Sequence, residues 1–173
     1  MLTFRKATSA DLPSICLLVK DAIAVMERNN IHQWDEIYPT EADYRGDINE
    51  ENLFVGEKDG EIAVVFAVNQ NQDTAYQFGN WSCHSGKFRV IHRLCVNPKF
   101  QNQGIAKQTL HHIEQTLKNK EVESIRLDVF TLNPHAIRLY ENAGYKKTGT
   151  AEWRKGVFWL MEKGMFWLME KGM

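Results

Sequence analysis

Apolar and polar residues follow two different periods along this chain. Apolar side chains recur every three or four positions from Leu12 to Met26, which predicts an amphipathic helix with one buried stripe. The same spacing from about Gln103 to Asn119 predicts a second long helix, and Glu41 to Asn49 is consistent with a short one. Short runs rich in β-branched and aromatic residues predict strands at residues 2–7, 53–57, 62–68, 88–96, 125–130, 145–153 and 157–162.

Capping and turn residues divide these elements. Ser9 is a predicted helix N-cap, and Lys58-Asp59-Gly60 is a predicted hairpin turn. Asn133 followed by proline predicts the start of another helix, which ends near Gly144. The order strand, helix, strand over residues 88–130 predicts a right-handed parallel crossover. We therefore expect an α/β fold whose mixed, mostly antiparallel sheet has one parallel strand pair at its centre.

Composition adds limits on function. The chain has 173 residues and a formal net charge of −1, which gives no sign of a nucleic-acid footprint or an anionic membrane partner. The first residues lack a signal-peptide core, and no apolar run is long enough to cross a bilayer. The three cysteines have no metal-ligand spacing, so we expect reduced thiols in a cytoplasmic protein that binds no metal.

The end of the chain contains an exact repeat. Residues 158–165 read FWLMEKGM, and residues 166–173 repeat those eight letters. The first copy completes the last predicted strand, so we expect one domain over residues 1–165 followed by a duplicated octapeptide. Because an unpaired apolar strand is an aggregation hazard, we expect the second copy to fold back, to be covered, or to pair across a homodimer.

The segment after residue 96 has an unusual composition for the start of a helix. Three amide residues (Gln101, Asn102 and Gln103) precede Gly104, and the small residue Ala106 and then Lys107 follow. A helix N-terminus offers unpaired N–H groups to an anion, and a glycine lets a phosphate approach the backbone. The spacing is neither that of a P-loop nor that of a Rossmann turn. A plain tight turn is the alternative interpretation.

Neighbouring motifs identify a family. Gln101 to Ala106 resembles the Q/R-x-x-G-x-G/A signature of the GNAT (GCN5-related N-acetyltransferase) superfamily, with Ala106 where many members have a second glycine. HRLCVNP before it resembles the family's fourth strand and turn. LDVFTLNPHAIRLYENAGY after it is similar to the fifth strand and following helix, with matching residues at Asn133, Ala136, Tyr140, Gly144 and Tyr145.

The resemblance implies a GNAT fold, with its central parallel strands splayed, that binds acetyl-CoA. It implies that the pyrophosphate lies on backbone N–H groups of Asn102 to Lys107, and that the pantetheine arm pairs with Leu94 to Val96. The Leu94 N–H would then polarise the thioester carbonyl. The implied cofactor-binding residues are Leu94, Cys95, Val96, Gln101, Asn102, Gln103, Gly104, Ile105, Ala106, Lys107, Asn133 and Tyr140.

The implied reaction is direct transfer of the acetyl group to a primary amine of a small molecule or peptide. Tyr140 stands at the position of the general acid that protonates the leaving thiolate. Asp128 and His92 are alternative bases, and ordered water is a third possibility. Cys95 is interpreted as a core residue, since no base stands near it in the sequence to activate it as a nucleophile.

The acceptor pocket of this fold draws on the connection between the first two helices. Trp34, Asp35 and Tyr38 are the candidate acceptor-binding residues there, because acidic and aromatic side chains suit a cationic amine. A packed aromatic loop is the alternative interpretation of the same residues. A catalytically silent CoA-binding sensor or recruitment module remains the competing function, and a nucleotide-binding protein is the third.

Overall fold

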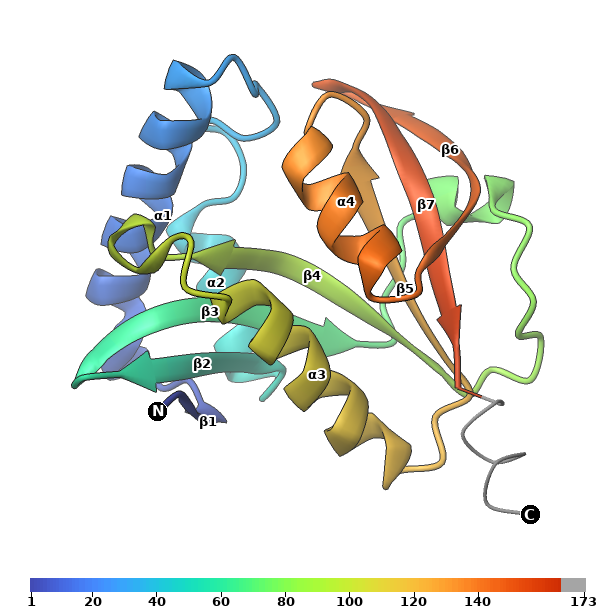
Figure 1. Cartoon of the computed structure of the whole chain (residues 1–173), viewed down its shortest axis with the longest axis horizontal. Coiled ribbons are helices and arrows are strands. Elements are labelled where there is room, and N and C mark those ends of the chain that lie inside the picture. The colour runs from blue at the N-terminus through green and yellow to red at the C-terminus, as the bar shows by residue number, and fades with distance from the viewer. Residues whose placement is uncertain (166–173) are drawn as a thin grey trace. The chain divides into compact units, whose positions relative to one another are not determined.

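The computed structural model describes residues 1–165, so the predictions made for the repeated copy at 166–173 fall outside the described residues (Figure 1). The helices are α1 (Leu12–Arg28), α2 (Glu41–Asn49), α3 (Ile105–Lys118) and α4 (Pro134–Asn142), with short 3₁₀ turns η1 (Ser9–Asp11), η2 (Thr74–Phe78) and η3 (Pro98–Phe100). The strands are β1 (Thr3–Lys6), β2 (Leu53–Lys58), β3 (Glu61–Asn69), β4 (Phe88–Val96), β5 (Ser124–Phe130), β6 (Lys146–Trp153) and β7 (Gly156–Gly164).

The seven strands form one mixed sheet in the order β1-β2-β3-β4-β5-β7-β6. Strands β4 and β5 are parallel, with Phe88–Val90 in register with Ser124–Arg126. The neighbouring pairs β1–β2, β2–β3, β5–β7 and β6–β7 are antiparallel. This arrangement confirms the predicted α/β class and the parallel pair at the centre of the sheet, and α3 is the crossover that the parallel pair requires.

Several predicted boundaries move by one or two residues. The first helical turn begins after Thr8, whose N–H donates to the Asp11 carboxylate at 2.8 Å, so Thr8 and not Ser9 occupies the capping position. Helix α3 begins at Ile105, two residues after the predicted start at Gln103; Ile105 is 2% exposed and Ala106 is half-buried. The predicted α2 is confirmed at both ends, and its N-cap Thr40 accepts from the Asp43 N–H.

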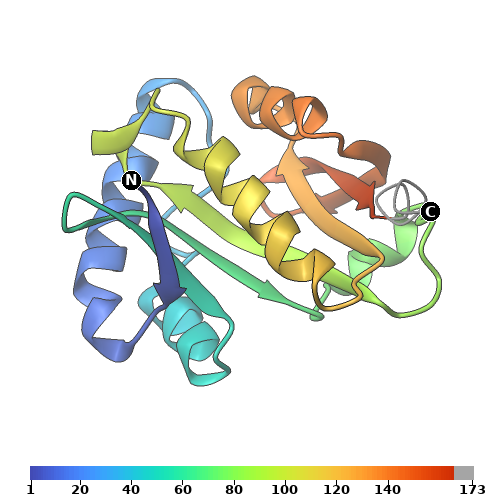
Figure 2. The same ribbon diagram turned by 60° about the horizontal axis from the view of Figure 1, so that its bottom comes forward.

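The chain divides into two compact units. The first unit comprises residues 1–68 and 92–109, and the second comprises residues 69–91 and those from Leu110 on. In the first unit, α1 and α2 cover one face of its strands (Figure 2), where side chains from α1, α2, β2, β3 and β4 share one core. That core includes Ile15, Tyr44, Val55, Val65 and Cys95.

The second unit has a smaller aromatic core. Tyr76 and Trp81 from the segment between β3 and β4 pack with Val90, Ala151 and Leu160. The segment predicted as a long polar loop therefore contributes two of the buried residues on which β6 and β7 pack. Across residues 1–165, no helix combines the length and the apolar character that crossing a bilayer requires.

Candidate active site

The turn after β4 is fixed to the neighbouring strand β3. The Asn97 N–H donates to the carbonyl of Ala63 at 2.8 Å, and the Asn97 amide Nδ2 donates to the carbonyl of Ile62 at 3.0 Å. The Asn97 side-chain oxygen also accepts from the Lys99 N–H, and Phe100 is only 8% exposed. These bonds hold the start of the turn in place ahead of the amide-rich segment.

Gly104 has the conformation that the turn needs. Its φ is +72°, and the φ of Asn102 is +62°, so both residues are left-handed. A Cβ at Gly104 would meet only the Gln108 side chain, at 3.8 Å, so backbone conformation and not crowding requires glycine here. The Gln108 N–H donates to the Gly104 carbonyl at 3.0 Å and closes the first turn of α3. The backbone N–H groups of the residues just before Gln108 lie at the N-terminus of α3, where a helix leaves N–H groups without intrahelical partners.

Cationic side chains border this turn. The Lys58 ammonium donates to the Gln103 side-chain oxygen at 2.7 Å, and Lys107 is exposed on the first turn of α3. Orphan N–H groups, a left-handed glycine without Cβ and nearby positive charge suit a phosphate group. The residues that the sequence assigned to the pyrophosphate therefore fit that ligand chemically.

Strand β4 is interrupted in its interior. Arg93 has a φ of +51°, which is left-handed and unusual for a strand residue other than glycine. In a strand with unbroken alternation His92, Leu94 and Val96 would share one face, and the left-handed residue between His92 and Leu94 breaks that alternation. All three of these side chains are half-buried, whereas Cys95 is 4% exposed and belongs to the core.

The unusual Arg93 is held by a bidentate ion pair. Its Nε and Nη2 donate to the two carboxylate oxygens of Asp47 on α2, the Nε bond being 2.8 Å long. Its Nη1 donates to the Tyr38 hydroxyl at 3.1 Å. Both charged side chains are largely buried, with 14% and 8% exposure. The pair therefore ties β4 to α2 and to the α1–α2 connection, where Tyr38 was predicted to meet the acceptor.

Burial controls the chemistry of Cys95. Loss of solvation raises the pKa of its thiol to about 12. The thiol is therefore protonated at neutral pH, which agrees with the interpretation of Cys95 as a core residue. The three cysteines are Cys16, Cys83 and Cys95, and none of them forms a disulfide within residues 1–165.

Helix α4 begins at Asn133 as its sequence predicts. The Asn133 side-chain oxygen accepts from the Ala136 N–H at 3.1 Å, which is the N-cap bond. Tyr140 on this helix is 8% exposed and lies edge-on to Tyr145 at 5.9 Å between ring centroids. Burial is the main cause that raises the pKa of Tyr140 well above that of a free phenol, and the charge of Asp128 raises it further.

Asp128 has a partner that sequence reasoning missed. The Tyr76 hydroxyl in η2 donates to the Asp128 carboxylate on β5 at 2.7 Å. Tyr76 is separated from Asp128 by 52 residues and lies in a segment without periodic spacing. The one available signal was the length of the loop, since long loops in compact domains are often functional.

The three predicted acceptor residues have different surroundings. Trp34 packs against the core of the first unit. The Asp35 carboxylate accepts from the N–H groups of Ile37 and Tyr38 at 3.0 and 3.3 Å, which organises the turn they share. Asp35 also lines a cavity of about 510 Å³ between α1, this connection and the start of α2, whereas Trp34 and Tyr38 are not among its lining residues.

The cavity is lined by four carboxylates and one lysine, but three of the carboxylates have partners. Glu27 pairs with His32 at 2.8 Å, Glu41 pairs with Arg45 at 2.6 Å, and Asp35 caps its own turn. Partnered carboxylates attract a cationic ligand less strongly than isolated ones. No cluster of metal-ligating side chains is present in the described part of the chain.

Comparison with known proteins identifies the family. The model of the acetyltransferase (GNAT) family matches residues 20–145, a range that includes the turn at Gly104 and Tyr140. This chain therefore belongs to the acetyltransferase (GNAT) family. It is 33% identical over 69 residues to N-acetyltransferase 8B of Mus musculus. It is 31% identical over 58 residues to the ribosomal protein bS18-alanine N-acetyltransferase of Escherichia coli K12.

The matches to these curated relatives are local. They include 40% and 34% of this chain and span only 29% and 39% of the relatives' own lengths.

Solved structures support the same fold over nearly the whole chain. A GNAT-family acetyltransferase from Streptococcus agalactiae 2603 has a TM-score of 0.84 at 24% identity, over 94% of this chain and 95% of that one. The PaiA N-acetyltransferase of Thermoplasma acidophilum, solved with coenzyme A, has a TM-score of 0.71 at 16% identity, over 95% and 99%. At these sequence identities the structural similarity establishes the fold, and it confirms the predicted GNAT fold.

Proposed function

We propose that this protein is an N-acetyltransferase that transfers the acetyl group of acetyl-CoA directly to a primary amine of a small molecule or a peptide. The observation that carries the proposal is the left-handed Gly104 turn at the start of α3, in a chain whose family match includes it. Family membership implies acetyl-CoA as the donor. The adjoining Lys58 and Lys107 place positive charge beside the turn, which suits an anionic phosphate.

The proposed binding residues are those of the turn and of β4. The backbone N–H groups from Asn102 to Lys107 bind the pyrophosphate, with the side chains of Gln101 and Gln103 beside them. The backbone of Leu94, Cys95 and Val96 pairs with the pantetheine arm. Asn133 contributes a contact from the N-terminus of α4, in addition to its capping role.

Acetyl-CoA supplies the activated acetyl group, and residues of this chain manage charge and protons around it. The Leu94 N–H donates to the carbonyl oxygen of the thioester, which stabilises the negative charge that develops there. Tyr140 gives its phenolic proton to the departing sulfur. Its raised pKa keeps the phenol protonated until that step.

The base that receives the ammonium proton is proposed to be Asp128 or His92. Asp128 has the stronger support, since it is half-buried, hydrogen-bonded by Tyr76 and close enough to influence Tyr140. The pH profile of kcat/KM decides between the two candidates. An ascending limb that shifts in Asp128→Asn but not in His92→Gln assigns the base to Asp128. The reverse result assigns it to His92, and no shift in either variant leaves the role to water.

The acceptor is proposed to meet the α1–α2 connection, through Asp35 in the cavity and through Tyr38 and Trp34 beside it. A panel of polyamines, amino acids, aminoglycosides and peptide N-termini, read by thiol release, tests the function. We expect release with at least one class of amine and the acetyl group on that amine. Binding of acetyl-CoA without release on any amine would favour the alternative, a catalytically silent CoA-binding module. Tighter binding of ATP than of CoA would favour a nucleotide-binding protein.

A further inference from the structure

The strongest unexplained feature is the hydrogen bond between Tyr76 and Asp128. The Tyr76 phenol, 2% exposed, reaches from η2 to the Asp128 carboxylate on β5 at a distance of 2.7 Å. A neutral donor on a carboxylate is a charge-assisted bond, which is stronger than a bond between two neutral groups. Both residues belong to the second compact unit. Neither the fold nor the phosphate turn requires a phenol at this position.

The surrounding aromatic residues fix the Tyr76 ring. Trp81 stacks on it, with 5.5 Å between ring centroids and 24° between planes, and the Trp81 indole N–H donates to the Tyr76 carbonyl at 2.7 Å. The Trp153 ring of β6 also lies near Tyr76, with 6.4 Å between the two ring centroids. Gly79 allows the stacking, because a Cβ there would lie 2.5 Å from the Trp81 ring. The ring therefore has little freedom to turn away from Asp128.

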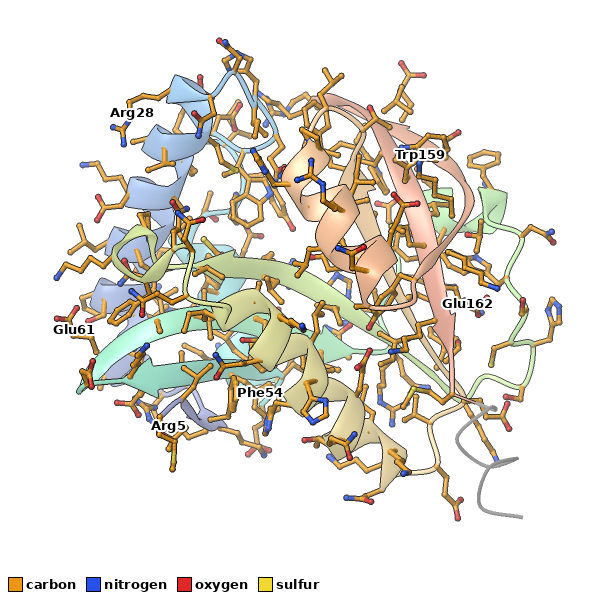
Figure 3. All side chains as sticks on the ribbon, viewed as in Figure 1. Arg5, Arg28, Phe54, Glu61, Trp159 and Glu162 are labelled. Atoms are coloured by element: carbon orange, nitrogen blue, oxygen red, sulfur yellow. The ribbon has the colours of Figure 1, made fainter. Side chains whose placement is uncertain are left out.

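The loop that carries Tyr76 is attached to β6 and β7. The Asn80 N–H donates to the Thr148 carbonyl at 2.9 Å. Glu162 of β7, labelled in Figure 3, accepts from the Ser82 N–H at 2.7 Å. Gly149 of β6 lies directly against the loop, since a Cβ there would be only 2.6 Å from the Phe78 carbonyl oxygen. The loop that carries Tyr76 is therefore attached to both β6 and β7.

The charge of Asp128 affects two phenols. Tyr76 faces it from η2, and Tyr140 on α4 has its pKa raised by burial and, next, by Asp128. Arg126, also on β5, interacts electrostatically with Tyr76 and with Glu162 of β7. Tyr145 is the further titratable group beside Tyr140. A hydrogen bond from a phenol favours the ionised form of a carboxylate, and the Tyr76 bond reaches the Asp128 carboxylate from η2.

We propose that Tyr76 is a positioning residue that fixes the ionised Asp128 carboxylate so that Asp128 and Tyr140 transfer their protons efficiently. The inference rests on the proposed function. As the amine adds to the thioester, its proton passes to Asp128, whose carboxylate Tyr76 holds in a fixed orientation. The C–S bond then breaks with its electron pair on sulfur, and the proton of the Tyr140 O–H forms the S–H bond of the thiol. Asp128 is neutral by then, so it does not repel the phenolate left on Tyr140.

Tyr76→Phe tests the proposal, because it keeps the ring and removes only the hydroxyl. The carbon-13 carboxyl signal of Asp128 should titrate at higher pH in this variant than in the wild type, because the bond that favours the ionised form is lost. With an amine that the wild type accepts, kcat should fall about tenfold. In an Asp128→Asn background, adding Tyr76→Phe should change kcat by less than about twofold, because the charge that Tyr76 controls is absent.

Ser124→Ala is the matched control. Ser124 lies on β5, the strand of Asp128, and is 0% exposed, but its hydroxyl is without a hydrogen-bond partner in residues 1–165. It should alter neither kcat nor the Asp128 titration. An equal loss of kcat from Tyr76→Phe with and without the Asp128 carboxylate would show a purely structural role and overturn the proposal, as would an unshifted Asp128 titration. If the wild type transfers acetyl to no amine, the proposed function fails, and the carboxyl titration still decides whether Tyr76 controls Asp128.

Discussion

At the scale of single residues, the structure changes how Tyr140 must be understood. Reasoning from the sequence treats it as an ordinary phenol, with a pKa of about 10 against about 8.5 for a thiol, so that proton transfer is nearly balanced. Burial and the neighbouring Asp128 raise the Tyr140 pKa. The phenol is therefore a weaker acid than a free tyrosine, and it remains a proton donor to higher pH.

Replacing Tyr140 with phenylalanine removes the donor and little volume. We expect kcat to fall about a hundredfold or more, because general acids contribute on that scale. The dissociation constant of acetyl-CoA should stay close to the wild-type value in a calorimetric titration, since the turn and β4 are untouched. An unchanged kcat, under conditions where chemistry is shown to limit the rate, would remove Tyr140 from the mechanism.

A second prediction at the scale of single residues concerns the buried thiol of Cys95. Its buried thiol, with a pKa raised to about 12, is not a nucleophile at neutral pH. Cys95→Ala should therefore keep kcat within about twofold and cost about 1 kcal/mol of stability, the usual scale for a small core substitution. Steady-state kinetics and urea unfolding measure the two effects. Loss of turnover in a folded Cys95→Ala protein would instead favour a covalent acyl-enzyme.

At the scale of elements, the turn before α3 depends on one backbone conformation. Gly104→Ala forces a Cβ onto a residue with a φ of +72°, although the space around it is open. It should cost about 1 kcal/mol or more in urea unfolding and raise the Kd of acetyl-CoA.

Gly46→Ala is the control for this substitution. Gly46 lies in α2 and has no left-handed φ, and a Cβ there would meet no atom within 4 Å beyond its chain neighbours and the helix's own backbone. Alanine there should stabilise the helix by up to about 1 kcal/mol and leave the Kd of acetyl-CoA unchanged. Equal effects of the two substitutions on the Kd would show that the turn at Gly104 is not the phosphate site.

Elements with strong local signals were predictable from the sequence. Helix α2 and strand β4 have the predicted bounds, and Asn133 caps α4 as expected, because caps and periodicity act over a few residues. The Tyr76–Asp128 bond was not predictable, since it joins residues 52 positions apart through a loop with no period. The left-handed Arg93 was also missed, because its ion pair with Asp47 stabilises a conformation that its own sequence does not signal.

At the scale of the whole molecule, ligand binding should be visible as stability. A ligand that binds only the folded state stabilises it by about 2.7 kcal/mol at a hundredfold excess over its Kd. Acetyl-CoA should therefore raise the melting temperature with increasing concentration, whereas ATP at equal concentration should raise it less. Absence of both a thermal shift and a calorimetric heat with saturating acetyl-CoA would contradict the donor assignment.

The most direct test of the account is a single-turnover experiment with the enzyme in excess over acetyl-CoA. The account predicts that thiol is released only when an accepted amine is present, and that mass spectrometry finds the acetyl group on the amine and none on the protein. Release of one equivalent of thiol without amine, with the acetyl group left on the protein, would contradict direct transfer. No release with any amine, despite bound acetyl-CoA, would contradict the enzyme itself.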